Sequence, residues 1–440
     1  MNKTNLSGKY GLIFTLFILS LILVLIFNLF TMNRQNNRRK EPTKVYFADN
    51  MSVAHLEIIR RFNEIYKNEI EIVPINLPFT KFSTNERKEL IARSLRDPES
   101  RIDIFAVDQI WTPRFAKWGE PLAKYFSQKN LSDLLRPALS TCYFNQTLVG
   151  IPLYIDLGVL YYRRDLLKKL TDEKNFEARL KRSISWEEMI VLSSQFGDDG
   201  NFYLFQGDNY EGLICNYFEF FFALGGNIHD GNRLRFNTEE GRKSAAFMVD
   251  LIHKYRLSPP EVTTFNERDS YFWALKHDAP FFRGWSSFLK DMTVPAPDSA
   301  KVKLLGMACL PHFDNRQPVT IFGGWNLMIS KYSTKKMEAV KFLEFILSEE
   351  SQNTLLRYAG YLPIRKDIYE NPEIFREFPY LTEITQMMNY GVHRPPLADY
   401  TKISDILSFH LNKALKGDIN VKTALKEVDK TIESKQHFIK

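Results

Sequence analysis

Strand and helix patterns alternate along residues 44–107. Within 52–67, Leu56, Ile59, Phe62 and Tyr66 recur at the spacing that places apolar side chains on one helical face. The predicted elements, in order, are a strand at 44–48, a helix at 52–67, a strand at 70–75, a helix at 84–96 and a mostly apolar strand at 102–107. This alternation is typical of a doubly wound α/β lobe with a mainly parallel sheet.

The pattern becomes mostly helical from about 165 to 300. Ser185 fits the capping position of a helix at 186–196, and residues 237–240 open a helix that runs to about 254. Strand patterns return at 302–308 and 319–330, and the chain from 334 onward is almost wholly helical. An α/β pattern that resumes after a long insertion predicts two lobes built from discontinuous segments. We assign 44–152 with 301–348 to an N-lobe, and 153–300 with 349–440 to a mostly helical α/β C-lobe.

The N-terminal segment from Gly11 to Met32 contains 22 uncharged residues rich in Leu, Ile and Phe. As a helix it reaches roughly 33 Å, enough to span a bilayer core. It is longer than a secretory signal core, and no small-x-small cleavage site follows it. We therefore expect an uncleaved transmembrane signal anchor at 11–32, followed by a polar linker at 33–43. Basic residues flank both ends of the segment, so charge alone does not set its orientation.

The net charge of +7 is concentrated beside this segment. Residues 1–44 hold seven Lys and Arg against one Glu, which leaves the remainder of the chain close to neutral. A nucleic-acid groove needs a basic stripe on the folded domain, so nucleic acid is excluded as the expected partner.

Motifs for metal binding and nucleotide hydrolysis are absent from the sequence. Cys142, Cys215 and Cys309 show no Cys-x-x-Cys spacing, and the eight His are scattered singly. Three buried thiols are the favoured interpretation, with one disulfide left open. The chain has no Gly-x-x-x-x-Gly-Lys-Ser/Thr loop, so any ATP hydrolysis belongs to partners. We expect no cofactor and no metal.

Five sequence blocks in order resemble family 1 extracellular solute-binding proteins of ABC importers, nearest to the trehalose/maltose-binding type. The blocks are 105–111 (FAVDQIW), 150–162 (GIPLYIDLGVLYY), 205–212 with its Phe-Gln-Gly and Tyr-Glu-Gly triplets, 322–326 (FGGWN) and 360–363 (GYLP). The resemblance covers residues 44–434. It implies a two-lobed type II periplasmic-binding-protein fold, α/β in class, with the ligand in the cleft between the lobes.

The resemblance also implies a mechanism and partners. Sugar bridging the two lobes stabilises the closed form by its differential affinity. The closed form then docks on ABC permease subunits whose cytoplasmic ATPases drive import. We expect a monomer that captures a di- or oligosaccharide at the outer side of the membrane.

Asp108, Tyr154 and Asp156 are the first candidate ligand contacts. Asp108 ends a predicted strand, and ligands of open α/β sheets lie outside the carboxyl ends of strands. Tyr154 and Asp156 lie two residues apart in an extended run and share one face, which offers a stacking ring beside a hydroxyl acceptor. The alternatives are a helix-capping role for Asp108 and pairing of Asp156 with an Arg.

Two tryptophans are candidate stacking platforms. Trp285 follows Phe281-Phe282-Arg283-Gly284, and Trp325 follows two glycines, of which Gly324 would let backbone approach a ligand closely. The resemblance places stacking residues at both tryptophan positions; by residue type alone, packing is the commoner role. Where relatives carry an aromatic two residues beyond Trp285, this chain has Ser287. The other four tryptophans are expected in the core.

Arg394 and Arg87 are carried over from the family as polar ligand contacts. The alternatives are a helix-terminal or surface role for Arg394 and an ordinary solvated charge for Arg87. Where the family often offers a Glu to the sugar, this chain has Asp49 and Asn50, either of which would have to substitute. Tyr210 and Glu211 begin a helix that faces the cleft in relatives, and Glu211 is also placed to favour the helix dipole.

We expect a binding protein and not an enzyme, with two other functional classes as alternatives. One is a membrane-anchored ligand-sensing module with the same fold, because an uncleaved helix is unusual for a freely diffusing binding protein. The other is a glycoside-acting enzyme that uses Asp108 and Asp156 as acid and base. The same fold also carries polyamines and iron, and fold alone does not choose among solutes.

Overall fold

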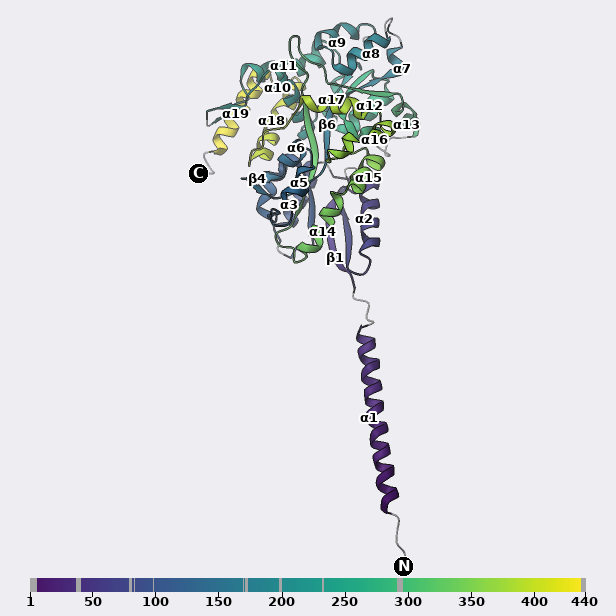
Figure 1. Ribbon diagram of the computed structural model, residues 1–440. Helices are drawn as coiled ribbons and strands as arrows, with labels where there is room; N and C mark the ends of the chain where they lie inside the picture. The colour runs from purple at the N-terminus through teal and green to yellow at the C-terminus, as the bar shows by residue number, and fades with distance from the viewer. Residues whose placement is uncertain are drawn as a thin grey trace, which may run out of the picture.

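A central sheet of nine strands runs through the α/β body (Figure 1). The computed structural model describes residues 6–36, 41–78, 81–82, 84–97, 99–168, 170, 173–197, 200–231, 233–290 and 296–436. Seven strands follow the order β2-β1-β3-β12-β6-β10-β7, while β11 pairs with β6 and β13 with β12. Two small hairpins, β4–β5 and β8–β9, stand apart from it.

The strands are β1 (Thr43–Asp49), β2 (Ile70–Asn76), β3 (Ile104–Asp108), β4 (Tyr143–Phe144), β5 (Thr147–Leu148), β6 (Ile151–Arg163), β7 (Tyr203–Leu204), β8 (His229–Asp230), β9 (Arg233–Leu234), β10 (Phe281–Trp285), β11 (Leu305–Ala308), β12 (Thr320–Ile329) and β13 (Gly391–Val392).

The α-helices are α1 (Leu6–Asn36), α2 (Val53–Ile65), α3 (Thr84–Ser94), α4 (Thr112–Phe115), α5 (Gln128–Ser132), α6 (Arg136–Ser140), α7 (Arg164–Leu167), α8 (Glu173–Arg182), α9 (Trp186–Ser193), α10 (Glu211–Ala223), α11 (Glu239–His253), α12 (Glu267–Lys276), α13 (Ala296–Val302), α14 (Lys336–Ile346), α15 (Glu349–Ala359), α16 (Pro372–Glu377), α17 (Leu381–Met387), α18 (Tyr400–Leu415) and α19 (Val421–Gln436). Among the described residues, six short 3₁₀ segments accompany them: Gln109–Trp111, Ala116–Trp118, Pro260–Thr264, Ser286–Lys290, Asp367–Glu370 and Met388–Tyr390.

The predicted helix starts agree with local capping chemistry. The hydroxyl of Ser185 accepts the backbone N–H of Glu188 at 3.1 Å and begins α9. Thr238 does the same for α11 by accepting the N–H of Gly241 at 3.0 Å. Such side chains satisfy backbone donors that the first helical turn leaves without a partner.

Strands β6 and β12 connect the two parts of the sheet. Residues 151–157 of β6 pair with β12, and residues 158–163 pair with β10 and β11. In the same way, β12 pairs with β3 through Trp325–Ile329 and with the short β13 at its other end. Every residue of both strands is buried, as expected of strands covered on both faces. The lobe boundaries given above remain a prediction.

Two expectations about the sheet need correction. The predicted parallel arrangement holds for β1 with β2 and β3, but β12 enters antiparallel to both β3 and β6, so the sheet is mixed. The strand expected at 302–308 begins only at Leu305, because α13 extends to Val302. Strand β10 was not predicted, since its five residues FFRGW show no clean alternation of apolar and polar side chains.

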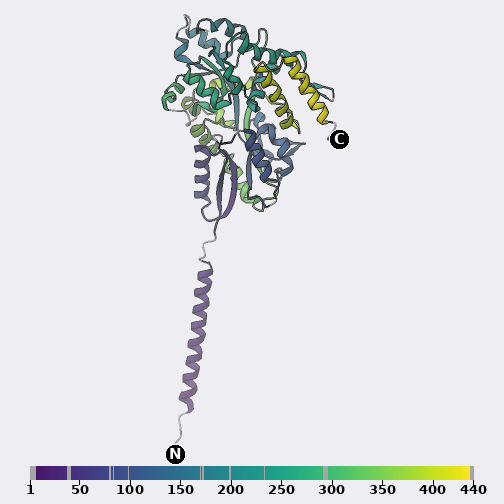
Figure 2. The same cartoon turned by 180° about the vertical axis from the view of Figure 1, so that it is seen from behind.

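The C-terminal helices α18 and α19, yellow in Figures 1 and 2, pack on each other and on α10 and α11. Residues 334–436 are helical as expected, apart from the two-residue strand β13 and connecting loops. All three cysteines are free and buried, which confirms the favoured interpretation over a disulfide. Burial raises the pKa of the Cys309 thiol to about 11.

The N-terminal helix α1 covers the segment expected to be an anchor and is drawn in purple in Figure 1. Large apolar side chains from Phe14 to Phe27 are exposed along it. Within the part of the chain that the structure describes, no helix combines the length and the apolarity that crossing a membrane demands. The transmembrane anchor predicted for 11–32 is therefore unconfirmed.

Candidate ligand-binding site

The sheet register brings five of the predicted residues onto one face. Trp325 of β12 lies opposite both Asp108 of β3 and Tyr154 of β6. Two residues beyond Tyr154 on β6, Asp156 lies opposite Gly323. After two more residues, Gly158 lies opposite Trp285 of β10. Opposed residues of antiparallel strands point to the same side, as do residues two apart on one strand. The side chains of Asp108, Trp325, Tyr154, Asp156 and Trp285 therefore project from one face of four adjacent strands.

Trp325 is supported by a cation held against its ring. The guanidinium carbon of Arg87 lies 4.4 Å from the ring centroid, and Trp111 contacts the ring edge-on at 5.9 Å between centroids. Arg87 Nη2 donates to Asp49 Oδ1 at 2.8 Å. Arg87 is fully buried and Asp49 is 3% exposed. We call Trp325, Arg87 and Asp49 the Trp325 stack.

Trp285 is supported in the same way by other residues. The guanidinium carbon of Arg283 lies 4.1 Å from the ring centroid of Trp285. Arg283 donates from Nη2 to Glu219 Oε1 at 2.8 Å and from Nε to Glu219 Oε2 at 3.3 Å. Arg283 is fully buried and Glu219 is 6% exposed. Burial raises the pKa of Glu219, and the charge of Arg283 opposes that rise. We call Trp285, Arg283 and Glu219 the Trp285 stack.

Asp156 lies between the two stacks. Its Oδ1 accepts the backbone N–H of Leu157 at 2.9 Å and the hydroxyl of Ser286, and its Oδ2 accepts the hydroxyl of Ser287 at 2.9 Å. Burial raises the pKa of Asp156, while these hydrogen bonds act in the opposite direction. Direct pairing with an Arg was the alternative role, and the side chains that donate to Asp156 here are serines.

Tyr154 stacks on a ring that the sequence did not single out. The rings of Tyr154 and Tyr361 are nearly parallel, with centroids 4.0 Å apart and 6° between planes. Tyr361 also contacts the edge of His55, whose Nε2 lies 3.3 Å from Asp49 Oδ2. One face of the Tyr154 ring is therefore already covered by protein.

Asp108, Arg394 and Glu211 form a buried charge network. Arg394 Nη2 donates to Asp108 Oδ1 at 2.8 Å, and its Nη1 donates to Glu211 Oε1 at 2.7 Å. Glu211 also accepts the hydroxyls of Tyr400 at 2.6 Å and Ser404 at 2.5 Å. Burial raises the pKa of Glu211, and the nearby charge of Arg394 lowers it. Arg394 is 2% exposed, so the surface role considered for it is wrong.

Two glycines make room for this arrangement. Gly324 has φ +130°, and a Cβ there would collide with the carbonyl oxygen of Tyr154 and lie 3.0 Å from the Cα of Ile155. A Cβ on Gly323 would lie 2.6 Å from Cζ3 of Trp285. Gly324 thus allows the strands to approach, and Gly323 leaves space for the indole ring.

Several sequence alternatives can now be decided. Asp108 does cap a short helix, because its Oδ1 also accepts the N–H of Ile110 at 3.1 Å. The solvated role considered for Arg87 is wrong, since this side chain is fully buried. Glu211 lies in the first turn of α10, as expected, with Tyr210 just before it. Three of the other tryptophans, Trp111, Trp118 and Trp186, lie in the core, and Trp273 is partly buried against it.

The sequence missed the residues that support the rings. Arg283, Glu219 and Tyr361 are contact partners of predicted residues but were not themselves predicted. Arg283 had a detectable signal, because an Arg two positions before Trp285 shares its face once residues 281–285 are recognised as a strand. Glu219 lies inside the apolar stretch of α10 and offered no such signal.

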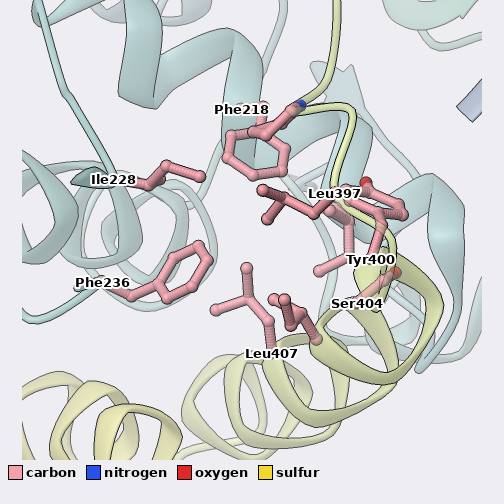
Figure 3. A pocket seen from close by; sticks show the side chains of 10 residues that line it. Phe218, Ile228, Phe236, Leu397, Tyr400, Ser404 and Leu407 are labelled. Carbon is pink, nitrogen blue, oxygen red and sulfur yellow. The ribbon is translucent and has the colours of Figure 1, made fainter. Parts of the chain in front are cut away.

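A small apolar pocket, too tight to admit a water molecule, lies beside the Glu211 network (Figure 3). Phe218, Phe236 and Leu407 point into it, and Tyr400 and Ser404 form part of its wall. None of the eight predicted ligand contacts lines this pocket. Its walls offer few polar groups, so it does not suit a hydroxyl-rich ligand.

Known proteins resemble this chain in sequence and in fold. A 25% identical relative from Deinococcus radiodurans, described as a probable ABC transporter-binding protein, aligns with 81% of this chain and 84% of its own length. The maltose-bound structure of T. maritima MalE3 superposes with a TM-score of 0.78 at 28% identity, covering 89% of this chain and 99% of its own. A cyclic α-maltosyl-1,6-maltose binding protein from Arthrobacter globiformis shares the fold at 20% identity, with a TM-score of 0.70, 89% of this chain and 98% of its own.

The two-lobed α/β periplasmic-binding-protein fold is therefore established for this chain. The family model for bacterial extracellular solute-binding proteins matches residues 47–353, which is more than half of the chain. This chain is a member of the bacterial extracellular solute-binding protein family.

Proposed function

We propose that this protein binds a di- or oligosaccharide between its lobes and delivers it to an ABC importer. The observation that carries the proposal is the shared sheet face, from which two tryptophans, one tyrosine and two carboxylates project. Aromatic rings stack on the apolar face of a pyranose, and carboxylates accept its hydroxyls. The resemblance to a maltose-bound protein at 28% identity supports the same ligand class.

Arg87 and Arg394 have a changed role in this proposal. Both are buried and engaged by carboxylates, so they act first on Asp49 and on Asp108 with Glu211. A bound sugar would share these guanidinium donors with their carboxylates or displace part of the network. Arg394 contacts two acidic side chains from separate segments, so it also ties β3 to α10.

The partners follow from the family. Closed, liganded protein would dock as a monomer on membrane permease subunits whose ATPases lie in the cytoplasm, with the body at the periplasmic or outer face. The membrane attachment by residues 11–32 belongs to the same proposal and is supported by their uncharged, apolar sequence. The protein should then stay in the membrane fraction after an alkaline wash. Release of the intact chain into the supernatant would contradict the attachment.

A thermal-shift and calorimetric screen tests the ligand class. The full-length chain is held in a detergent without a sugar headgroup and titrated with maltose, a cyclic tetrasaccharide and D-mannitol. We expect a disaccharide to raise the Tm, and we expect Trp325→Ala or Asp108→Ala to abolish the shift. Asp108→Ala leaves Arg394 paired with Glu211, so its fold should survive.

The matched control truncates a tryptophan outside the site. Trp118 is 7% exposed and packs on Phe115, and its carbonyl accepts the N–H of Lys331 just beyond the far end of β12. Trp118→Ala should lower the Tm but keep the ligand-induced shift. A shift of wild-type size in both Trp325→Ala and Asp108→Ala would rule out this site. Turnover of a glycoside by the purified protein would instead favour the enzyme alternative.

A further inference from the structure

Arg283 is placed to control the orientation of Trp285. The two residues lie two apart on β10, so both side chains leave the same face of the strand. The guanidinium then covers the indole at 4.1 Å from its centroid.

The rest of Trp285 is fixed from several directions. Its backbone N–H donates to the hydroxyl of Tyr271 at 2.8 Å, and its carbonyl accepts the hydroxyl of Tyr161 at 2.8 Å. The indole Nε1–H donates to Glu267 Oε1 at 3.3 Å. The ring nevertheless remains only partly buried, so a ligand can reach the exposed part.

Glu219 connects this ring to the strands that run between the two parts of the sheet. Besides its two bonds from Arg283, Glu219 Oε1 accepts the backbone N–H of Ile321 on β12 at 3.4 Å. A Cβ on Gly158 of β6 would collide with Glu219 and lie 2.7 Å from Arg283 Nη2. The ion pair therefore occupies the space directly over β6, two residues from Asp156.

A buried ion pair such as Arg283–Glu219 usually adds little net stability to a protein core. Two buried charges lose their hydration, and replacing such a pair with apolar side chains is often neutral or stabilising. Their position against a candidate ligand ring therefore needs another explanation than stability.

We propose that Arg283, held by Glu219, is a positioning residue that fixes the plane of the Trp285 ring for ligand stacking. The proposal rests on the function proposed above and adds residues to it. The fork of two bonds sets the orientation of the guanidinium plane, and the ring lies against that plane. Lysine cannot reproduce either feature, because its ammonium is a point charge without a planar face.

A double-mutant cycle on maltose affinity tests the proposal in the full-length protein. The four proteins are the wild type, Arg283→Lys, Trp285→Phe and the double variant. We expect Arg283→Lys to weaken maltose binding about tenfold, because the Trp285 ring is then no longer held in the plane that stacks on the ligand. In the Trp285→Phe background the same change should weaken binding less than twofold, since the indole that Arg283 positions is replaced by a smaller phenyl ring.

Two further variants distinguish an effect on the orientation of the Trp285 ring from a general loss of stability. Arg163 is also a buried Arg, 3% exposed and paired with Asp165 and Asp278, and it lies at the end of β6 beyond the site. Arg163→Lys should lower the Tm as much as Arg283→Lys does and leave maltose affinity unchanged. Where Arg283→Lys does not fold, the neutral double variant Glu219→Leu/Arg283→Met replaces it in the cycle.

The outcomes discriminate between the two proposals. A wild type that binds maltose, with additive effects of Arg283→Lys and Trp285→Phe, overturns the positioning role alone. An equal loss of affinity in Arg163→Lys also overturns it, because the effect is then one of general stability. A wild type that binds none of the screened sugars overturns the proposed function and this inference together.

Discussion

The Trp325 stack and the Trp285 stack contain the same parts but are assembled differently. Each has an indole ring, a fully buried Arg over that ring and a buried carboxylate that binds the Arg at 2.8 Å. In the Trp285 stack, ring and Arg come from one short strand. In the Trp325 stack, the Arg comes from α3 and the carboxylate from the end of β1. One stack is therefore set by strand geometry and the other by the packing of separate elements.

The carboxylates also differ in what else they hold. Asp49 contacts Arg87 and His55 and accepts the backbone N–H of its own neighbour Asn50. Glu219 accepts two bonds from Arg283 and the backbone N–H of Ile321 on a distant strand. The Trp285 stack therefore depends on a distant strand although its ring and its Arg share β10, because Glu219 binds the backbone of β12. Substitution of Glu219 should therefore affect its contact with β12 as well as the orientation of the Trp285 ring.

Removing the carboxylates should have the largest effect. Glu219→Gln leaves a fully buried guanidinium without its charged partner, so we expect a loss of about 3–5 kcal/mol in the free energy of unfolding. Asp49→Asn removes the negative charge that faces Arg87 and His55, and we expect a loss of about 2–3 kcal/mol. Urea unfolding followed by circular dichroism measures both.

Glu57→Gln is the control for charge removal as such. Glu57 binds Arg60 and Arg61 on the surface of α2, where solvent screens the pairs. Its removal should cost less than about 1 kcal/mol. A loss from Glu219→Gln no larger than this would show that the buried pair contributes little, and would weaken the comparison between the stacks.

Substitutions of the two glycines on β12 should destabilise the two stacks by different amounts, and this effect is the next largest. Gly324→Ala forces a side chain into φ +130° and against the backbone of Tyr154, so we expect a loss of about 3 kcal/mol at the Trp325 stack. Gly323→Ala meets only the Trp285 ring, which can shift, and about 1 kcal/mol is expected. Unfolding midpoints test the difference, and a larger loss from Gly323→Ala would contradict it.

Tryptophan fluorescence tests independently whether Gly323→Ala moves the Trp285 ring. Gly323→Ala should shift the emission of the folded protein, because the Trp285 ring moves relative to Arg283. The same Gly323→Ala change in a Trp285→Phe background should leave the emission unchanged. A persistent shift in that background would mean that another tryptophan responds.

Much of the fold was predictable because the elements carry local signals. The strand and helix over 44–65 and the caps of α9 and α11 follow from apolar spacing and from Ser185 and Thr238. Strand β10 was missed because FFRGW combines a buried charge with apolar neighbours, and only tertiary pairing with β6 decides its state.

The sequence predicted the candidate ligand contacts but not the residues that support them. Motif positions pointed to Asp108, Tyr154 and Trp325, and the register places them side by side. Their supporting partners, Glu219 and Tyr361, come from elements remote in sequence, so no spacing rule could reveal them. Arg87 and Arg394 were predicted as open ligand contacts, but the sequence could not show that buried carboxylates already hold them.

Acid should destabilise the folded protein through His393. His393 packs on Phe322 beside Arg394, and burial together with the Arg394 charge lowers its pKa from 6.5 to about 4. Between those values the unfolded chain binds a proton that the folded chain excludes, so stability falls as the pH drops from 6.5 to 4. Because His393 is only partly buried, we expect it to contribute about 1–2 kcal/mol to this loss.

His393→Phe removes the titration and keeps a ring against Phe322. The variant should lose less stability than the wild type between pH 6.5 and pH 4, measured by urea unfolding at each pH. At pH 7.5, where His393 is neutral in both the folded and the unfolded chain, the proton linkage contributes nothing to the difference between the two proteins. Parallel curves for the two proteins across the range would exclude His393 as the cause.

The smallest expected effect concerns the link between Asp156 and the Trp285 side. Ser287 follows β10 and donates to Asp156 Oδ2 at 2.9 Å, while Ser286 and Leu157 donate to Oδ1. Ser287→Ala removes the donor of Oδ2 and leaves Oδ1 fully bonded, so about 1 kcal/mol of stability should be lost. A ligand hydroxyl can then replace the missing donor at Oδ2. Maltose affinity should therefore fall no more than about threefold, whereas Asp156→Asn, which removes the charge, should reduce it by more than tenfold. Equal losses in the two variants would mean that Asp156 acts on the ligand only through Ser287.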